Sequence, residues 1–160
     1  TRLRTVTGVQ TCALPILHGV GVSCVNALSE VLDLEIARGG KLLLYHGWSD
    51  PSISPLNTIN YYDAVNKKLG GNQEGWMRLF LLPGVGHCGG GVGPDQADFL
   101  GAMERWRESG TAPDQIVATR NAGRGGQTPL SRPLCPFPQV ARYSGSGSTD
   151  DANNFKCVQP

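Results

Sequence analysis

The sequence has no excess of charge of either sign. Its 160 residues include 14 Lys and Arg against 13 Asp and Glu, so the formal net charge is +1. Proteins that bind nucleic acid or anionic membranes through their overall electrostatic field carry a marked excess of basic residues. The near-neutral balance therefore argues against both kinds of partner.

Long apolar runs are also missing. The longest candidates lie around residues 42–44 and 80–82, far short of the ~18 to 20 residues that a membrane-spanning helix needs. We therefore expect no membrane span. Since 39% of the residues are hydrophobic, while 22 are glycine and 11 are proline, the composition predicts a packed core with many ordered loops.

Motifs for phosphate and metal binding are absent as well. The glycine-rich loop at 84–93 has no Lys followed by Ser or Thr and lacks the spacing of a dinucleotide-binding loop, which argues against phosphate as a ligand. His87 and Cys88 have no second pair of ligands at a suitable spacing, so we expect no metal and no cofactor in this chain. A single Arg among the glycines at 123–126 predicts a surface turn rather than an RNA-binding segment.

The N-terminal residues need separate treatment. The chain does not begin with Met, and residues 6–16 (VTGVQTCALPI) closely resemble the translation of a common sequencing adapter. We therefore expect residues 1–16 to be a cloning or assembly scar, with residues 17–160 as the native part of the chain. A natural but poorly ordered terminus is the alternative.

The middle of the chain has a pattern typical of α/β proteins. Residues 41–46 (KLLLYH) form a short apolar run, which is typical of a strand buried in a parallel sheet. Apolar residues then recur at helical intervals over 55–69, and residues 76–82 (WMRLFLL) predict a second buried strand. Strand, loop, helix and strand together predict a βαβ unit.

The flanking regions are patterned less clearly. Residues 27–38 predict a short helix or an irregular segment, residues 95–109 a helix, and residues 115–119 one further strand. A polar turn is expected at 121–127. Residues 128–160 show no periodicity and are rich in proline and in serine-glycine pairs, so we expect them to lie as an extended strap across the domain.

Titratable side chains follow both strands of the predicted βαβ unit. Asp50 lies in the loop after the first strand, and His87 lies in the loop after the second. Groups at the carboxyl ends of parallel strands can converge on one cleft. A carboxylate that binds one imidazole nitrogen leaves the other nitrogen free as a general base, and Asp before His is the chain order of α/β-hydrolases. The pair therefore predicts the acid and base of a hydrolase.

Each of these residues also has a simpler interpretation. An Asp after a strand often binds its own backbone in a turn, and a His among glycines is commonly solvated. His46 and Trp48 could line the cleft, although residues at the end of a buried strand more often pack or cap. A non-catalytic binding or structural module, in which Asp50 and His87 only close turns, therefore stays open.

The residues around this pair resemble a known family. Residues 39–51 (GGKLLLYHGWSDP) and 83–91 (PGVGHCGGG), with 132–136 (RPLCP) and 138–141 (PQVA) in the tail, are similar to the C-terminal part of the tannase and feruloyl esterase family. The resemblance covers about 36–158. It implies an α/β fold: the C-terminal part of an α/β-hydrolase sheet with flanking helices and a disulfide-tied C-terminal strap, present here as an incomplete domain.

The resemblance also implies an activity. Members are serine esterases that cleave esters of aromatic acids such as gallate or ferulate, or related terephthalate half-esters. Asp50 would orient the imidazole, and His87 would take the serine proton and return it to the leaving alcohol. Another α/β-hydrolase without the aromatic preference is the alternative.

Parts of that family's machinery have no counterpart in the sequence. The chain contains no Gly-x-Ser-x-Gly element, so we expect the nucleophilic serine upstream and expect this chain alone to be inactive. The resemblance further implies an inserted lid domain, which carries calcium and much of the aromatic-acid pocket, and this domain is not expected in the present residues.

The cysteines favour a secreted or periplasmic protein. Cys135 and Cys157 bracket the strap, and a disulfide between them would stabilise the fold by about 3 kcal/mol; two buried thiols are the alternative. In the family, the cysteine that Cys88 resembles is linked to one beside the nucleophilic serine, so the partner of Cys88 would lie upstream. The surroundings of Cys24 do not match that partner, and its pairing stays open. Disulfides persist in oxidising compartments.

Overall fold

The computed structural model describes residues 36–87, 89–121 and 128–160 of the chain. The predictions for residues 1–16, for most of 27–38 and 121–127, and for Cys24 and Cys88 lie outside the described residues. Within the described part of the chain, no helix combines the length and the apolar character needed to cross a membrane.

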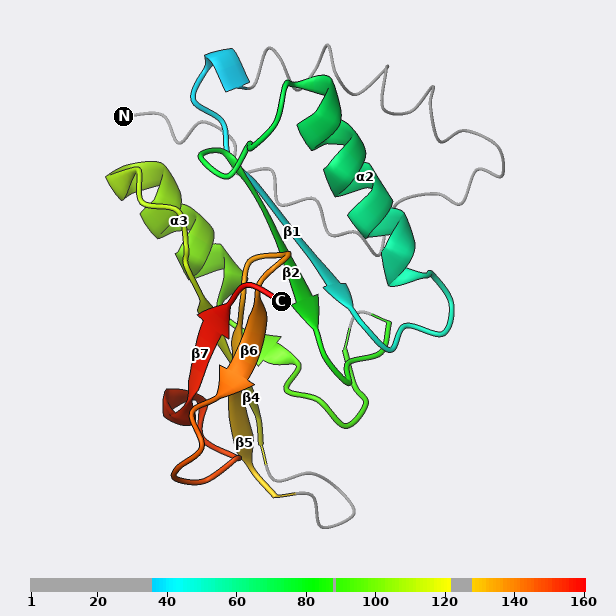
Figure 1. The fold of residues 1–160 in the computed structure, drawn as a ribbon, viewed down its shortest axis with the longest axis vertical. Helices are drawn as coiled ribbons and strands as arrows, with labels where there is room; N and C mark the ends of the chain where they lie inside the picture. Colours follow the sequence, from blue (N-terminus) through cyan, green and yellow to red (C-terminus); the bar gives the residue numbers. More distant parts are fainter. Residues whose placement is uncertain (1–35, 88, 122–127) are drawn as a thin grey trace.

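A parallel pair of strands forms the centre of the described fold. β1 (Leu42–Gly47) and β2 (Met77–Leu82) are paired residue by residue along their whole length. α2 (Pro55–Lys68) connects them, so the predicted βαβ unit is confirmed, with each strand starting one residue later than predicted. Because both strands run in the same direction, the loops that follow them leave from the same end of the strand pair, the carboxyl end (Figure 1).

Local sequence sets the bounds of α2. At its start, Ser54 Oγ accepts a hydrogen bond from the Leu56 N–H, and Pro55 takes the first helical position, where no backbone donor is needed. In its last turn, Lys67 and Lys68 place positive charge beside the unpaired carbonyl groups of the helix end, which is favourable. The helix therefore begins and ends where capping chemistry predicts.

The second helix, α3 (Phe99–Ser109), starts later than predicted. Asp98 is its N-cap, and the Asp98 carboxylate accepts from a backbone N–H of the first turn at 2.8 Å. The residues before the cap form the short strand β3 (Gln96–Ala97) instead of helix. Gly110 ends the helix in the left-handed conformation with φ of 74°, as its position predicts.

A second sheet of the described residues is antiparallel. β3 pairs with β4 (Ile116–Arg120), and β4 pairs with β5 (Leu130–Leu134). The predicted strand at 115–119 is confirmed as β4, displaced by one residue, but it belongs to this second sheet and does not extend the parallel pair. The architecture is therefore α/β with parallel and antiparallel parts.

The C-terminal residues are more regular than predicted. Besides β5, they form β6 (Val140–Tyr143) and β7 (Phe155–Val158), which pair antiparallel, and the short 3-10 helix η2 (Ala152–Asn154). The prediction of an unpatterned strap is wrong in this respect, because the segment is extended but its backbone is paired. Residues of β6 are mostly exposed, so no alternation of apolar and polar residues marked this strand in the sequence.

Cys135 and Cys157 form the predicted disulfide. The bond joins the residue directly after β5 to β7. Next to it, Pro136 forms a β-bridge with Phe80, and the Phe137 N–H donates to a carbonyl of β2 at 2.7 Å. The C-terminal segment is therefore attached to the central strand pair as well as closed upon itself.

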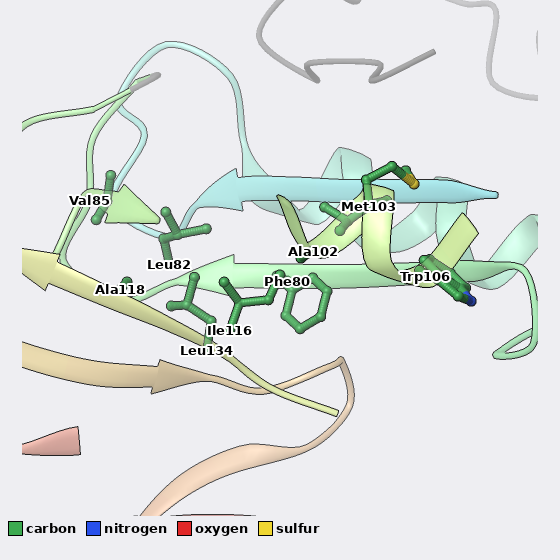
Figure 2. Packing of buried hydrophobic residues seen from close by; sticks show 10 residues of the cluster. Phe80, Leu82, Val85, Ala102, Met103, Trp106, Ile116, Ala118 and Leu134 are labelled. Carbon is green, nitrogen blue, oxygen red and sulfur yellow. The ribbon is translucent and has the colours of Figure 1, made fainter. Parts of the chain in front are cut away.

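The core lies on both faces of the parallel pair. Side chains of β1 alternate, so that Leu43 packs on the side of α3, whereas Leu42 and Leu44 pack on the side of α2. The two helices cover opposite faces of the strands (Figure 1). Figure 2 shows the α3 side, where α3 packs over β1 and β2 next to residues of β4 and β5. The buried members of this cluster are Leu43, Phe80, Leu82, Val85, Ala102, Met103, Trp106, Ile116, Ala118 and Leu134. Burial on both faces fixes the strand ends from which the functional loops emerge.

Candidate functional site

The loop after β1 folds into a turn around Asp50. The Asp50 N–H donates to the Gly47 carbonyl at 3.2 Å, and Asp50 Oδ1 accepts from the N–H groups of Ser52 at 2.8 Å and Ile53 at 2.9 Å. This is the local bonding that an Asp in a turn commonly makes. It occupies one carboxylate oxygen and leaves Oδ2 for other partners.

The loop after β2 is shaped by its glycines. The Gly86 N–H donates to the Gly90 carbonyl at 3.0 Å, and the Gly90 N–H donates to the Asp95 carboxylate at 2.7 Å. Gly91 has φ of 96°, a region that glycine adopts without strain, and a Cβ at this position would overlap a carbonyl oxygen of the same loop. The glycine-rich run therefore forms a compact loop that presents His87.

Backbone hydrogen bonds join these two loops. The Trp48 N–H donates to the Leu82 carbonyl at 2.9 Å, and the Ser49 N–H donates to the Val85 carbonyl at 3.0 Å. These bonds continue the contact between β1 and β2 beyond the ends of the strands. The close approach requires Gly47, because a Cβ there would overlap carbonyl oxygens of the second loop. Asp50 and His87 are thus carried on loops that are fixed relative to each other.

Asp50 and His87 are in direct contact. His87 Nδ1 lies 2.7 Å from Asp50 Oδ2. An ionised carboxylate can only accept, so Nδ1 carries the proton of this hydrogen bond. The Asp50 side chain is 2% exposed and the His87 side chain is 37% exposed. A shielded carboxylate therefore orients an imidazole that solvent can reach.

The Asp50 carboxyl is held in its charged form. Burial removes it from water and by itself raises its pKa, but the N–H groups of Ile53 and Ser52, together with the hydrogen bond and positive charge of His87, outweigh burial and lower the pKa to about 2. The carboxylate is consequently ionised at neutral pH.

A second histidine lies behind this pair. His46, on β1, is 4% exposed, and its Nδ1 lies 2.7 Å from Thr58 Oγ1. Its Nε2 lies 3.1 Å from the Ile53 carbonyl oxygen and 3.2 Å from Asp50 Oδ2. His46 is therefore packed against Asp50 instead of lining an open cleft, whereas Trp48 is 47% exposed. The contact with Thr58 could not be predicted from the sequence, although the position of His46 at the same strand end as Asp50 could have indicated that these two side chains lie close together.

The arrangement has the chemistry of a general base. With Nδ1–H bound to a carboxylate, the His87 ring keeps a lone pair on Nε2. That nitrogen can take a proton from a hydroxyl group within hydrogen-bond reach, and the neighbouring carboxylate stabilises the imidazolium that results. A hydroxyl group placed at Nε2 would become a nucleophile.

The described residues do not offer a metal site. In residues 36–87, 89–121 and 128–160, no group of three or more His, Cys, Asp or Glu side chains is arranged to hold an ion. The calcium that the sequence resemblance implies for a lid domain therefore has no ligand set in this part of the fold. The expectation that this chain needs no metal or cofactor stays a prediction.

Comparison with known proteins identifies similar chains. The family model described as tannase and feruloyl esterase matches residues 27–158. The chain is 48% identical over 124 residues to a mono(2-hydroxyethyl) terephthalate hydrolase of Piscinibacter sakaiensis, an alignment that covers 77% of this chain and 20% of that protein. It is 42% identical over 125 residues to a probable feruloyl esterase of Arthroderma benhamiae, covering 76% of this chain and 23% of that protein.

A solved structure also resembles the described fold. The crystal structure of feruloyl esterase B from Aspergillus oryzae superimposes with a TM-score of 0.69 at 30% sequence identity, covering 79% of this chain and 28% of that chain. The present chain thus spans about a fifth to just over a quarter of the length of these similar proteins.

Proposed function

The chain belongs to the tannase and feruloyl esterase family, and from this premise we propose that it is the acid-and-base part of a carboxylic ester hydrolase. The observation that carries the proposal is the 2.7 Å contact between Asp50 Oδ2 and His87 Nδ1 at the carboxyl edge of the parallel strands. Two side chains that only closed their own turns would have no need to meet across loops from different strands.

In the proposed reaction His87 transfers protons and Asp50 keeps its ring oriented. His87 Nε2 takes the proton of a serine hydroxyl as the serine oxygen attacks the ester carbonyl carbon. The imidazolium then gives this proton to the leaving alcohol, and an acyl-enzyme remains. In the second half of the cycle, His87 takes a proton from water as the water oxygen attacks the acyl carbon, and returns it to the serine.

The nucleophilic serine is proposed to lie upstream of this chain. No Gly-x-Ser-x-Gly element occurs in the 160 residues, and the order Ser, Asp, His along the chain of α/β-hydrolases places the serine before Asp50. We accordingly expect the isolated chain to hydrolyse esters no faster than background, because removing the nucleophile removes the covalent step.

The proposed substrates are esters of aromatic acids. This follows from the names of the similar proteins, which include a mono(2-hydroxyethyl) terephthalate hydrolase and a probable feruloyl esterase. The family resemblance assigns much of the aromatic-acid pocket to a lid domain, so the preference is proposed to be set by parts of the protein outside the described residues. The Cys135–Cys157 disulfide supports a further part of the proposal, that the protein is exported to an oxidising compartment.

The test uses the full-length protein that contains this chain. We expect hydrolysis of methyl ferulate, methyl gallate or mono(2-hydroxyethyl) terephthalate, and no comparable turnover of methyl butyrate, measured by chromatography of the released acid. His87→Ala should lower kcat/KM by at least about 10³-fold, because the general base is lost. Turnover of the aliphatic ester at the same rate would favour a hydrolase without an aromatic preference.

A second variant tests the role of Asp50. Asp50→Asn should lower kcat by about 10³- to 10⁴-fold, because an amide that donates to Nδ1 selects the wrong imidazole tautomer. Asp114→Asn, an exposed aspartate before β4, is the matched control and should keep full activity. If Asp50→Asn retained full activity while folding normally, Asp50 would not be the orienting acid.

A further inference from the structure

The buried contacts of His46 show which ring nitrogen must carry hydrogen. Its Nε2 faces the Ile53 carbonyl oxygen at 3.1 Å and Asp50 Oδ2 at 3.2 Å. A carbonyl and an ionised carboxylate are both acceptors. The hydrogen therefore lies on Nε2, since a lone pair there would face two other lone pairs at a site that is 4% exposed.

Thr58 completes this assignment from the other side of the ring. Its hydroxyl group is the partner of His46 Nδ1, at 2.7 Å. In a neutral ring that carries hydrogen on Nε2, Nδ1 is an acceptor, so the Thr58 hydroxyl donates. Thr58 is 3% exposed and belongs to the first part of α2. A threonine at this place in a helix can instead bond its hydroxyl to a carbonyl of the preceding turn, but here the hydroxyl is directed to His46.

From these contacts we propose that Thr58 and His46 are positioning residues that hold the Asp50 carboxylate for His87, an inference that rests on the proposed hydrolase function. The Thr58 hydroxyl donates to His46 Nδ1, and His46 Nε2–H donates to the Ile53 carbonyl at 3.1 Å, while the same nitrogen lies 3.2 Å from Asp50 Oδ2. The same oxygen accepts from His87 Nδ1–H at 2.7 Å. Oδ1 is held separately by the backbone N–H groups of the turn.

The arrangement restricts rotation of the carboxyl group. The backbone bonds to Oδ1 fix one oxygen, and the His46 contact fixes the direction of the second. Without the Nε2–H of His46, the Ile53 carbonyl of this turn would lose its hydrogen bond and Oδ2 would lose the polar contact beside its short contact with His87, so the carboxyl group would be less restricted. Since Thr58 lies on α2 and His46 on β1, the helix that connects the two strands would contribute directly to the orientation of the base.

The first experiment reads the tautomer of His46 directly. In the full-length protein labelled with ¹⁵N in its histidines, the ¹⁵N shifts of each ring report which nitrogen carries hydrogen. We expect His46 to be neutral with hydrogen on Nε2 alone. A ring with hydrogen on Nδ1, or on both nitrogens at neutral pH, overturns the proposal, and it does so whether or not the protein is found to be an esterase.

The second experiment removes the hydroxyl group of Thr58 and keeps its shape. Thr58→Val should lower kcat by about tenfold with little change in KM, because the base is misdirected while substrate binding is untouched. Thr58→Ser, which restores a hydroxyl, should recover most of the activity. Thr119→Val is the matched control, since the Thr119 hydroxyl pairs with a Gln96 carbonyl on the antiparallel sheet, and it should behave as wild type.

The outcomes separate this proposal from the function on which it rests. If the wild-type protein hydrolyses none of the esters, the proposed function fails, and the ring measurement on Thr58→Val still tests the inference: the His46 signals should change and the His87 Nδ1–H should exchange faster with solvent. If Thr58→Val keeps wild-type kcat and leaves both histidine rings unchanged, the positioning role is wrong. Equal loss of activity in Thr58→Val and Thr58→Ser overturns it as well, because the hydroxyl would then not be the group that matters.

Discussion

At the scale of single residues, the central feature is a carboxylate that is shielded and still charged. Removing an ionised carboxylate from water is costly unless hydrogen-bond donors replace the water. Asp50 obtains its donors from the turn that it starts and from His87 on the second loop, and His46 Nε2 lies 3.2 Å from its Oδ2. Its protonation state is therefore a direct measure of whether these contacts exist in solution.

The pKa of Asp50 gives a prediction that does not depend on activity. In the wild-type protein, ¹³C NMR of the carboxyl group should show a pKa of about 2. In His87→Ala this pKa should rise, because the hydrogen bond and the positive charge of His87 both lower it. An Asp50 pKa that is the same in both proteins would show that the two side chains are not in contact in solution.

The lowered pKa of Asp50 also predicts the direction in which stability changes with pH. Because folding lowers the pKa of Asp50, the folded state favours the ionised form, and the resulting stabilisation is fully present above the unfolded pKa of ~3.9. It is lost as pH falls through about 2. The difference in unfolding free energy between wild type and Asp50→Asn should therefore be constant above pH ~4 and change between pH ~4 and 2, measured by urea titration at each pH. A difference that stayed constant down to pH 2 would contradict the lowered pKa.

Sequence alone could locate part of this site. Asp50 and His87 stand just after apolar runs and among turn-forming residues, so local pattern was sufficient to place both at the carboxyl edge of the sheet. The role of His46 was not predictable in the same way. Its contact with Thr58 joins a strand to a helix, and this contact depends on how the helix packs, which no local pattern specifies.

At the scale of elements, the close contact of the two loops depends on a glycine. A Cβ on Gly47 would overlap the carbonyl oxygens of Val85 and Gly86, which belong to the loop that carries His87. Neither loop can move away easily, since the N–H groups of Trp48 and Ser49, directly after Gly47, donate to carbonyl groups of the other segment. The end of β1 thus tolerates only the smallest residue.

Gly47→Ala should therefore destabilise the fold and separate the loops. We expect a loss of about 1–3 kcal/mol of unfolding free energy, as for other overpacked sites, together with lower ester hydrolysis, measured by urea titration and by the assay above. Gly75→Ala is the control: no atom lies within 4 Å of a Cβ at Gly75, so its stability should change little. If Gly47→Ala were as stable and as active as Gly75→Ala, the loops would not be as closely joined as described.

Prediction of the elements succeeded where local chemistry was sufficient. β1, α2 and β2 are flanked by glycine and proline and have clear periodicity, and their bounds were within one residue of the structure. β5 was missed because Pro133 lies within it, and proline in a run of residues argues against a strand. In the structure, Pro133 pairs with Val117 of β4. This pairing depends on the tertiary fold, which the sequence around Pro133 does not specify.

At the scale of the whole molecule, the C-terminal segment is held mainly by a covalent bond and by backbone pairing. The β6–β7 hairpin has few buried side chains, so burial contributes little to its position. The Cys135–Cys157 bond closes a loop with a sequence separation of 22 residues, and the segment next to it is attached to β2. The disulfide therefore stabilises an otherwise weakly packed part of the fold.

Removing this bond should lower stability measurably. For a closed loop of this length, the chain-entropy model gives about 3 kcal/mol, so the double variant Cys135→Ala with Cys157→Ala should lose about that much unfolding free energy in urea titrations without reductant. Because the hydrogen bonds that hold Asp50 and His87 involve no residue of the disulfide-closed segment, kcat should change little. A loss well below ~1 kcal/mol would show that backbone pairing alone holds the segment.

Because β1 and β2 are parallel, the lengths of the two loops at their carboxyl ends affect the contact between Asp50 and His87, whereas the length of the connection at their amino ends does not. Gly47 stands opposite Leu82, so the number of residues from there to Asp50 and to His87 sets whether their side chains meet; a single insertion in either loop would misalign them. The exposed connection after α2, around Gly70 and Gly71, lies at the amino ends of the two strands. An engineer could attach a tag, a linker or a fused domain at this connection.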